Sequence, residues 1–377
     1  MSIILATSDN HIGFRQYGIL ERENDIEKAF HNILKLAAEF SADAITVSGD
    51  LLHSTRPTSK TMDFMSHMHE ILKLARLPCF VSSGNHDKSD PHWVEILGNE
   101  HDYLDGGFKL IDNQQVNIGN ISIYGQPFVS KKEWAEKKKS IPEVDILLMH
   151  QSYAEFAFAN PDTSFYPKDL KDLKVNTIIM GDTHVTEDRM INDSTMLISP
   201  GSSELISTAE PDQKYVIFID KNDEGCFNRS RIPLRTRPII RGLVETEEDV
   251  EGIFGLISHT ILENDHYDYP LVFIDYDPAV AHVVETIRRQ WDGIMLRARP
   301  KVFPPFPSQG QQNQEEPKKE VPKQEEAASI LSKMLPPNTH ASTDTLAFEL
   351  LEPECDVNVK IDDYVKRWRA EVDTDRV

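Results

Sequence analysis

The chain has 377 residues, more than one ordinary domain needs, so two or three folded units are expected at roughly 100–200 residues each. Forty lysines and arginines against 62 aspartates and glutamates give a formal charge of −22 and a pI of about 5.0, which argues against a protein that binds nucleic acid through its overall charge. No apolar run approaches the roughly 20 residues that span a bilayer, and the first residues, MSIILATSDNHIG, do not resemble a secretory signal.

The first 220 residues or so alternate short apolar runs with amphipathic patterns, which predicts an α/β domain. Apolar residues recur at helical spacing from Ile26 to Phe40 and from Met62 to Leu74, so each segment is predicted to be a helix. Late apolar runs without a helix between them predict hairpins, and therefore mixed rather than purely parallel sheets. The predicted strands are Ile3–Leu5, Ala44–Val47, Cys79–Val81, Ile121–Tyr124, Ile146–Met149, Ile178–Met180, Thr195–Ile198 and Tyr215–Ile219.

A smaller unit is expected to follow. Helical patterns at Glu245–Ile261 and Val280–Gln290 flank a predicted strand at Leu271–Ile274, which is enough for a small α/β cap domain. Pro, Gln, Lys and Glu then dominate the composition, which predicts a disordered linker that cannot bury enough apolar surface to fold. We therefore divide the chain into residues 1–232, 233–302, 303–326 and 327–377.

Residues 327–377 are predicted to form a tethered helical tail that docks on a partner. Ile361, Val365 and Trp368 share one helix face, and apolar anchors at this spacing are typical of helices that bind in a groove. The alternative interpretation is a segment that folds back on the core.

Acid, amide and imidazole side chains follow five of the predicted strands. Because the carboxyl ends of strands in an α/β sheet converge on one crevice, separated segments can deliver these side chains to one place. The set has hard oxygen donors and imidazoles but no thiolate, which suits Mn²⁺, Mg²⁺ or Fe²⁺ better than a structural zinc ion. The five segments are Asp9-Asn10-His11, Gly49-Asp50, Gly84-Asn85-His86-Asp87, His150 and Gly181-Asp182-Thr183-His184.

Each of these motifs taken singly also has an ordinary structural interpretation. An Asp-x-His or a Gly-Asp after a strand is typical of a cap or turn, and a lone histidine at a strand end is typical of a hydrogen-bonded core residue. The joint occurrence of the motifs in this order predicts a two-metal site. The glycines beside Asp50, Asn85 and Asp182 agree, because glycine lets the backbone turn sharply and approach closely.

In this order the motifs resemble those of the calcineurin-like metallophosphoesterases. The resemblance implies an α/β fold with a sandwich of two mixed sheets flanked by helices, and a dinuclear metal centre at the strand ends. The stretch from Gly49 to Thr58 departs from the Gly-Asp-x-Val-Asp-Arg-Gly of the phosphoprotein phosphatases and is similar to DNA double-strand-break repair nucleases of the SbcD type. The segments Ser199–Ser203 and Pro233–Pro238 extend that resemblance to roughly residues 1–300.

The same resemblance implies roles for individual residues. His86 would protonate the leaving 3′-oxygen or stabilise the transition state, Asp87 would orient its ring, and His53 would help to position DNA near the scissile phosphate. Asp50 would bridge two divalent metal ions, Mn²⁺ in the first place with Mg²⁺ as the alternative. One ion would be bound by Asp9, His11 and His184, and the other by Asn85, His150 and Asp182.

One ligand position departs from the family pattern. The usual Gly-His-x-His reads Gly181-Asp182-Thr183-His184 here. Aspartate is a competent ligand, and a third carboxylate would favour hard Mn²⁺ or Mg²⁺ while leaving a weaker Lewis acid. The alternative is a lost or weakened second metal ion.

For function, the resemblance implies a DNA exonuclease and endonuclease subunit that acts on DNA ends in recombination and repair. The implied partners are an SbcC-like ABC ATPase with a coiled coil and a second copy of the chain, as a homodimer within a heterotetramer. An acidic chain agrees with DNA held largely by the ATPase, although five arginines between Arg229 and Arg241 form either a local basic stretch or an ordinary solvated face. Two alternatives stay open: a phosphodiesterase or phosphatase acting on small or non-DNA substrates, and a weakly active scaffold for the ATPase.

The cysteines indicate a compartment. Cys79, Cys226 and Cys355 are too far apart in sequence for a disulfide framework or a zinc knuckle, which fits a reducing cytosol. We expect a cytoplasmic, nucleoid-associated protein, in the host cytoplasm if the chain is phage-encoded, with no membrane partner.

Overall fold

A computed structural model describes most of the chain up to residue 300. The described residues are 2–97, 105–156, 164–264, 266–290 and 295–300. The predicted linker at 303–326 and the predicted docking residues Ile361, Val365 and Trp368 lie outside them, so these predictions stay open.

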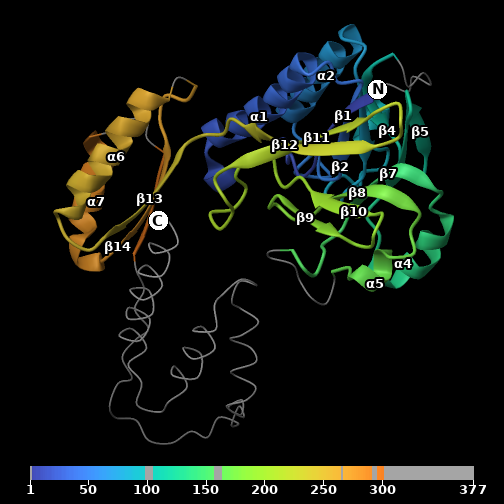
Figure 1. The fold of residues 1–377 in the computed structure, drawn as a ribbon. Helices are drawn as coiled ribbons and strands as arrows, with labels where there is room; N and C mark the ends of the chain where they lie inside the picture. Colours follow the sequence, from blue (N-terminus) through green and yellow to red (C-terminus); the bar gives the residue numbers. More distant parts are fainter. Residues whose placement is uncertain (1, 98–104, 157–163, 265, 291–294, 301–377) are drawn as a thin grey trace, which may run out of the picture. The chain divides into compact units, whose positions relative to one another are not determined.

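The first sheet is built from both ends of the region up to residue 234. Its strands are β1 (Ser2–Thr7), β2 (Ala44–Ser48), β3 (Pro78–Ser82), β4 (Gly107–Leu110), β11 (Lys214–Lys221) and β12 (Phe227–Leu234). They lie in the order β12-β11-β1-β2-β3-β4 (Figure 1). The run from β1 to β4 is parallel, whereas β11 is antiparallel to both β1 and β12, so the sheet is mixed as predicted.

The second sheet comes from the middle of the chain. Its strands are β5 (Gln115–Ile118), β6 (Ile121–Gln126), β7 (Val144–His150), β8 (Val175–Gly181), β9 (Glu187–Met190) and β10 (Met196–Ser199). They lie in the order β5-β6-β7-β8-β10-β9. The central strands are parallel and the two outer hairpins are antiparallel, which makes this sheet mixed as well.

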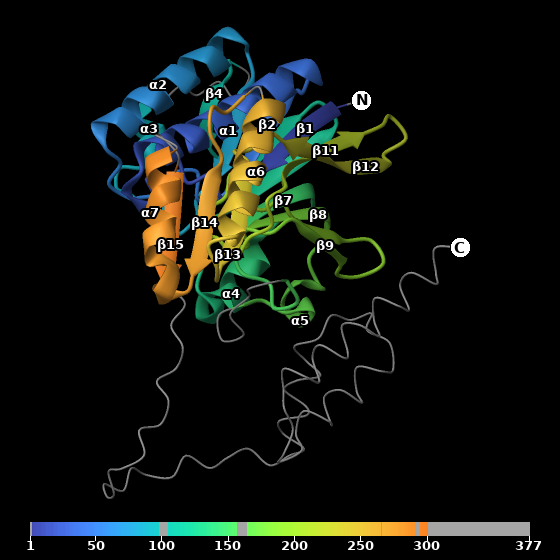
Figure 2. The same cartoon turned by 90° about the vertical axis from the view of Figure 1, so that its left-hand side faces the viewer.

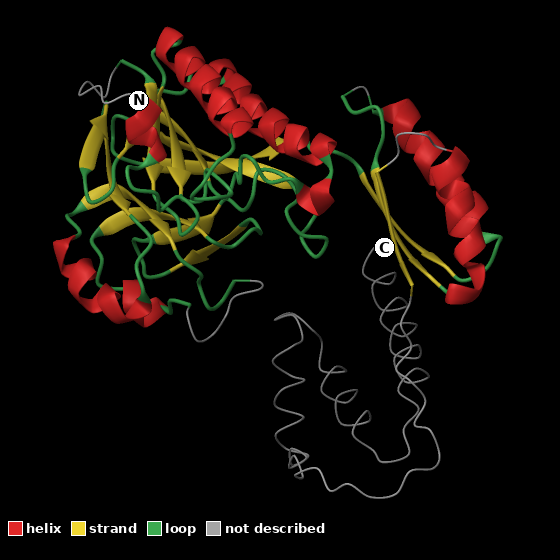
Figure 3. Ribbon diagram, turned by 180° about the vertical axis from the view of Figure 1, so that it is seen from behind, coloured by secondary structure: helices red, strands yellow, loops and turns green. Residues whose placement is uncertain are grey.

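Helices cover the outer faces of the two sheets (Figure 3). Apolar side chains such as Phe30 on α1 (Leu20–Glu39) and Met65 on α2 (Ser59–Leu74) pack on the first sheet. Between the sheets, Ile4 and Ile146 belong to one buried cluster. Trp134 on α4 (Lys131–Lys137) packs on the outer face of the second sheet, where α5 (Pro167–Leu170) also lies. This is the predicted α/β sandwich of two mixed sheets flanked by helices.

A third sheet lies within residues 233–302, where the sequence predicts a cap. The parallel strands β13 (Ile239–Val244), β14 (Leu271–Tyr276) and β15 (Met295–Pro300) have α6 (Asp249–Glu263) and α7 (Ala281–Gln290) on one face (Figure 2). Ile257 and Ile287 on these helices pack against the sheet. The expected boundary after residue 232 falls inside β12, because Leu234 still pairs with Lys214 of the first sheet.

Candidate metal centre

The predicted side chains meet at the carboxyl ends of β1, β2, β3, β7 and β8. Backbone hydrogen bonds join the segments that carry them: the amide of Asp9 donates to the carbonyl of Gly49 at 3.1 Å, and that of His11 donates to the carbonyl of Asp50 at 3.0 Å. His150, the last residue of β7 in the second sheet, donates from Nδ1 to the Ser48 carbonyl of the first sheet at 2.9 Å. The segments after the strand ends of both sheets therefore form one site.

The backbone at the strand ends is strained. Asp9, His11, Asp50 and Asp182 all have a positive φ, between 48° and 78°. Non-glycine residues in this left-handed region cost of order 1–3 kcal/mol each and cluster at functional sites. Four separate occurrences at the predicted ligand positions indicate that side-chain placement dictates the backbone here.

Two glycines make room for the site. Gly49 has a φ of 83°, and a Cβ there would lie 2.3 Å from Nδ1 of His150. At Gly84 a Cβ would lie 2.1 Å from Oδ1 of Asp50. Both are needed because the backbone packs directly against predicted ligand side chains.

Asp9, His11 and His184 form the first group of candidate ligands. Their ligand atoms all lie within 4.8 Å of one another, and the Nε2 atoms of the two histidines are 3.2 Å apart. Asp9 is fully buried, and its Oδ2 has no hydrogen-bond partner. A buried carboxylate oxygen without a donor is costly, and a cation between it and two imidazoles would remove that cost.

The second group surrounds Nε2 of His150. This atom lies 3.1 Å from Oδ1 of Asn85, 3.3 Å from Oδ2 of Asp50 and 3.9 Å from Oδ1 of Asp182. Oδ2 of Asp50 is also 3.9 Å from Nε2 of His11. Asp50 therefore lies between the two groups, where a bridging ligand belongs.

Hydrogen bonds at Nδ1 fix the direction of three imidazoles. Nδ1–H of His150 donates to the Ser48 carbonyl, that of His184 to Oε1 of Glu210 at 2.9 Å, and that of His86 to the His53 carbonyl at 2.6 Å. Each Nε2 is then left as the nitrogen that faces the centre. Such outer partners set the tautomer and ring orientation of metal-binding histidines.

The electrostatics of the group favour added positive charge. Burial opposes a charged ring at His150, but the carboxylates of Asp50, Asp9 and Asp182 raise its pKa to about 10. Burial raises the pKa of Asp9 to about 6. Burial works against ionisation of Asp50 too, yet the imidazole of His150 holds the pKa of Asp50 far below its usual range. The carboxylates around His150 therefore favour positive charge at this place, which divalent cations can supply.

The structure places Asp87 differently from the expectation. Its carboxylate accepts hydrogen bonds from the amides of Leu51, Leu52 and Gly84, so it joins the segments after β2 and β3 and does not contact the His86 ring. The partner of that ring is the His53 carbonyl, because the backbone turn after β2 brings the carbonyl within 2.6 Å. These contacts give Asp87 a role in holding the two segments, and its expected role in orienting His86 stays a prediction.

His53 and His86 lie together at the mouth of the site. Their rings are stacked with centroids 5.5 Å apart, and each lies 5.3–5.4 Å from the ring of His11. Both side chains are half-buried, so a phosphate at the metal centre would lie within reach of them.

Glu210 is a residue that the sequence did not reveal. Its buried carboxylate accepts from His184 and, at 2.6 Å, from Nζ of Lys214. Burial opposes the charge, but the hydrogen bond from His184 and the charge of Lys214 lower the pKa of Glu210 to about 2. The only sequence signal was indirect: Ser202, within the Ser199–Ser203 segment, donates to Glu210 at 3.0 Å.

Three of the five arginines in the stretch are ion-paired. Arg237 is buried against Asp25, Arg241 pairs with Asp212 at 2.6 Å, and Arg231 pairs with Asp188. The partners of the other two carry no negative charge: Thr177 and Asn176 for Arg229, and His266 for Arg235. The stretch therefore keeps two arginines whose charge is not neutralised by these contacts.

Comparison with known proteins agrees with this geometry. Residues 3–186 match the family model for the calcineurin-like phosphoesterases. The chain contains a calcineurin-like phosphoesterase domain. The resemblance inferred from the motifs is thereby confirmed for the domain.

Among curated proteins, this chain is similar to several that bear the name DNA double-strand break repair protein Mre11. The one from Methanosarcina mazei is 30% identical over 272 residues, which cover 69% of this chain and 43% of that protein. For Methanococcus maripaludis the identity is 33% over 58% of this chain and 60% of that protein. For the protein from Thermoplasma acidophilum the identity is 26%, over 80% of this chain and 84% of that protein. The chain thus spans less than half the length of the Methanosarcina protein.

Proposed function

We propose that this chain is a metal-dependent phosphodiesterase that cleaves DNA at or near its ends, as the nuclease subunit of a recombination and repair complex. The observation that carries the proposal is the position of Asp50 between two groups of ligands, one of which contains the unpaired buried oxygen of Asp9. DNA as the substrate is supported by similarity to repair proteins named Mre11.

The donor atoms fit two hard divalent ions. We propose Mn²⁺ for both, with Mg²⁺ as the alternative. Asp50 would bridge them. When bound, such a pair lowers the pKa of a water molecule and neutralises charge on a phosphodiester. The ligands would be Asp9, His11 and His184 for one ion, and Asn85, His150 and Asp182 for the other.

The remaining histidines would act on the substrate. Nδ1–H of His86 is committed to the His53 carbonyl, so Nε2 is the atom that can give a proton to the leaving oxygen. The stacked His53 ring would help to position the phosphate beside it.

A comparison of substrates tests the proposal. The full chain should hydrolyse linear duplex DNA and, more slowly, a p-nitrophenyl phosphodiester with Mn²⁺, and EDTA should abolish both activities. Rapid turnover of the p-nitrophenyl substrate without DNA cleavage would favour a small-molecule phosphodiesterase. No turnover of either substrate would favour a scaffold.

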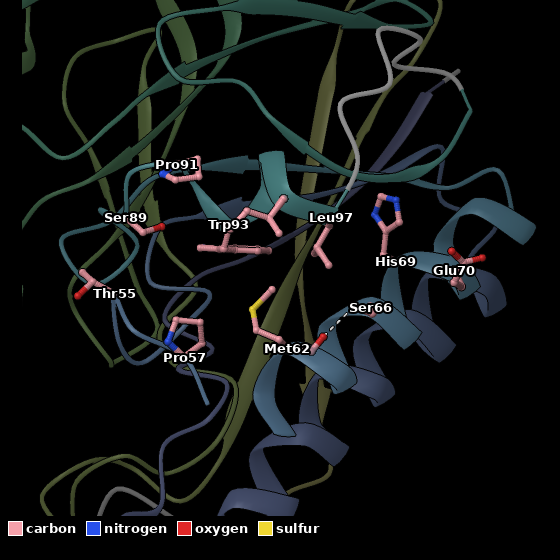
Figure 4. A pocket seen from close by; sticks show the side chains of 11 residues that line it. Thr55, Pro57, Met62, Ser66, His69, Glu70, Ser89, Pro91, Trp93 and Leu97 are labelled. Carbon is pink, nitrogen blue, oxygen red and sulfur yellow. Dashed lines mark hydrogen bonds between the residues drawn. The ribbon is translucent and has the colours of Figure 1, made fainter. Parts of the chain in front are cut away.

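We also propose a homodimer formed through α2 and α3 (Trp93–Leu97). Leu74 on α2 is 85% exposed and Ile96 on α3 is 61% exposed. Ile96 also lines a hollow of about 500 Å³, together with apolar side chains that include Met62, Trp93 and Leu97 (Figure 4). A second copy could bury this surface, and light scattering would give the molar mass.

The further partner we propose is an SbcC-like ABC ATPase with a coiled coil, which would complete a heterotetramer with two nuclease subunits. The proposed location is the cytoplasm, at the nucleoid or in the host cell of a phage. Among the described residues, no helix has the length and apolar character needed to cross a membrane.

A further inference from the structure

A cavity of about 660 Å³ adjoins the metal centre on the side of Asn85 and Asp182. Because Asn85 lies 3.1 Å from His150, the cavity opens directly onto proposed ligands of the second metal ion. The rest of its lining carries none of the residues considered so far. It consists of Phe128, Val129, Ser130, Lys131, Lys132, Gln151 and Ser152.

Phe128 gives the cavity a fixed aromatic ring. Its backbone amide donates to the Ser83 carbonyl at 2.8 Å, which ties the segment after β6 to the segment after β3. The half-buried ring lies 6.4 Å from the His150 ring, centroid to centroid. Nζ of Lys88 lies over the Phe128 ring, 4.5 Å from its centroid, so its ammonium group covers one face of the ring, although Lys88 does not line the cavity.

Two lysines and one carboxylate, that of Asp182, line the cavity, and its wall is held in place. Lys132 is exposed at its rim, whereas Lys131 is anchored by a 2.7 Å hydrogen bond to the Ser164 carbonyl. Gln151 donates to the Val129 carbonyl at 2.6 Å, which fixes the wall next to Phe128. Two lysines beside an aromatic ring are notable in a chain with a net charge of −22.

We propose that this cavity binds the unpaired nucleotide next to the scissile phosphate, with its base against Phe128 and a backbone phosphate near Lys132. Aromatic rings bind the face of any base, and lysines bind the phosphate backbone, which is the chemistry of single-strand recognition. The volume lies within the range of small-ligand sites. A paired base cannot enter without unstacking, so a frayed or single-stranded end is the form that fits. The proposal rests on the proposed nuclease function.

Binding can be measured without cleavage. The probe is 2-aminopurine deoxyribonucleoside 5′-monophosphate, whose fluorescence is quenched by stacking, added to the full chain. The wild-type chain should quench it, Phe128→Ala should weaken binding about 5- to 100-fold, and Phe128→Trp should retain it. Lys132→Glu, a change at an exposed position, should also weaken binding. A matched control is Phe227→Ala on β12, a half-buried ring with Nζ of Lys221 at 5.2 Å, which should change nothing.

Cleavage gives the second measurement. Two oligonucleotides should differ only by an abasic residue next to the cleaved phosphodiester. The wild-type chain should cleave the intact one several-fold faster, and Phe128→Ala should remove the difference. Quenching without any DNA cleavage would overturn the nuclease function and leave the cavity assignment standing. DNA cleavage without quenching and without an abasic effect would overturn the cavity assignment alone.

Discussion

His86 reaches the centre through Nε2 alone, because the His53 carbonyl holds its Nδ1–H. If it acts as a proton donor to the leaving group, His86→Ala should lower kcat by roughly 10²–10⁴, the usual contribution of a general acid. Its metal content should stay near two ions per chain, measured by elemental analysis. Joint loss of metal and activity would instead make His86 a ligand.

Asp182 stands where the family pattern has histidine, and its Oδ1 is 3.9 Å from Nε2 of His150. If it binds the second metal ion, Asp182→Ala should abolish hydrolysis, and Asp182→His should retain part of it while shifting the metal preference toward softer ions. Asp182→Asn removes the charge and leaves the backbone conformation possible, because asparagine also tolerates the φ of 78°. This variant therefore distinguishes the effect of the carboxylate charge from an effect of the backbone. An alanine variant with unchanged rate and metal stoichiometry would show that Asp182 only shapes a turn.

Glu210 fixes the tautomer of His184, so its effect should appear in metal affinity. Glu210→Gln should weaken Mn²⁺ binding about 10- to 100-fold in a competition titration. Glu204→Gln is the matched control, because Glu204 is equally buried in the same segment but bonds Arg22, at 3.1 Å, and the amide of Leu205. Equal losses of affinity in both variants would mean that the segment, and not the contact with His184, is responsible.

At the scale of the elements, the sequence predicted those strands that are buried apolar runs. All eight strands predicted before residue 220 are present. The strands missed there are short or polar: β4 reads GFKL, β5 QVNI and β9 EDRM, and their pairing depends on neighbours distant in sequence. The sequence does not predict β12 (Phe227–Leu234), because its alternating polar residues resemble a loop, yet it pairs along all of β11.

In the site, too, the sequence predicts some residues and not others. Its candidate ligands could be predicted because each follows a strand within a few residues and topology brings the strand ends together. Glu210 could not, since 26 residues separate it from His184 and no short motif marks the contact. Phe128 was missed for a related reason: an aromatic residue after a strand is ordinary until a cavity is found beside it.

A buried ion-pair network joins α1 to the segment before β13. Asp25 accepts from Arg22 at 2.7 Å and from Arg237 at 2.6 Å, and all three side chains are buried. Asp25→Ala leaves two buried guanidinium groups short of a partner, so the free energy of unfolding should fall by about 3–5 kcal/mol. Arg241→Ala is the control: its pair with Asp212 is 40% and 51% exposed, and its loss should cost at most about 1 kcal/mol. Urea titrations of both variants measure the two losses in free energy of unfolding. Equal midpoints would contradict the larger contribution expected of the buried ion-pair network.

At the scale of the whole molecule, charge limits how DNA can be held. The chain carries −22, and the five arginines between Arg229 and Arg241 have internal partners. If the chain is the proposed nuclease, positive potential for a DNA strand would come from bound metal ions, from arginines and lysines without a carboxylate partner such as Arg229 and Lys132, and from a partner protein. Such a nuclease would depend on its assembly for affinity while keeping its chemistry in one domain.

Because the proposed chemistry lies in one domain, the last prediction concerns the tail, residues 327–377. All seven proposed ligands lie within the compact unit Met1–Val302, so deleting residues 327–377 should leave metal content and Mn²⁺-dependent hydrolysis of a p-nitrophenyl phosphodiester unchanged. The deletion should abolish association with the ATPase, because Ile361, Val365 and Trp368 supply the proposed anchors.

Trp368→Ala is the finer form of the same experiment. A buried tryptophan anchor contributes ~2 kcal/mol or more, so the substitution should weaken binding of the ATPase about thirtyfold in a calorimetric titration. Lys360→Ala, a neighbouring change that removes no apolar anchor, is the control and should leave the affinity within about twofold. If the truncated chain loses metal or unfolds, the tail belongs to the core; if it still binds the ATPase with full affinity, the docking surface lies elsewhere in the chain.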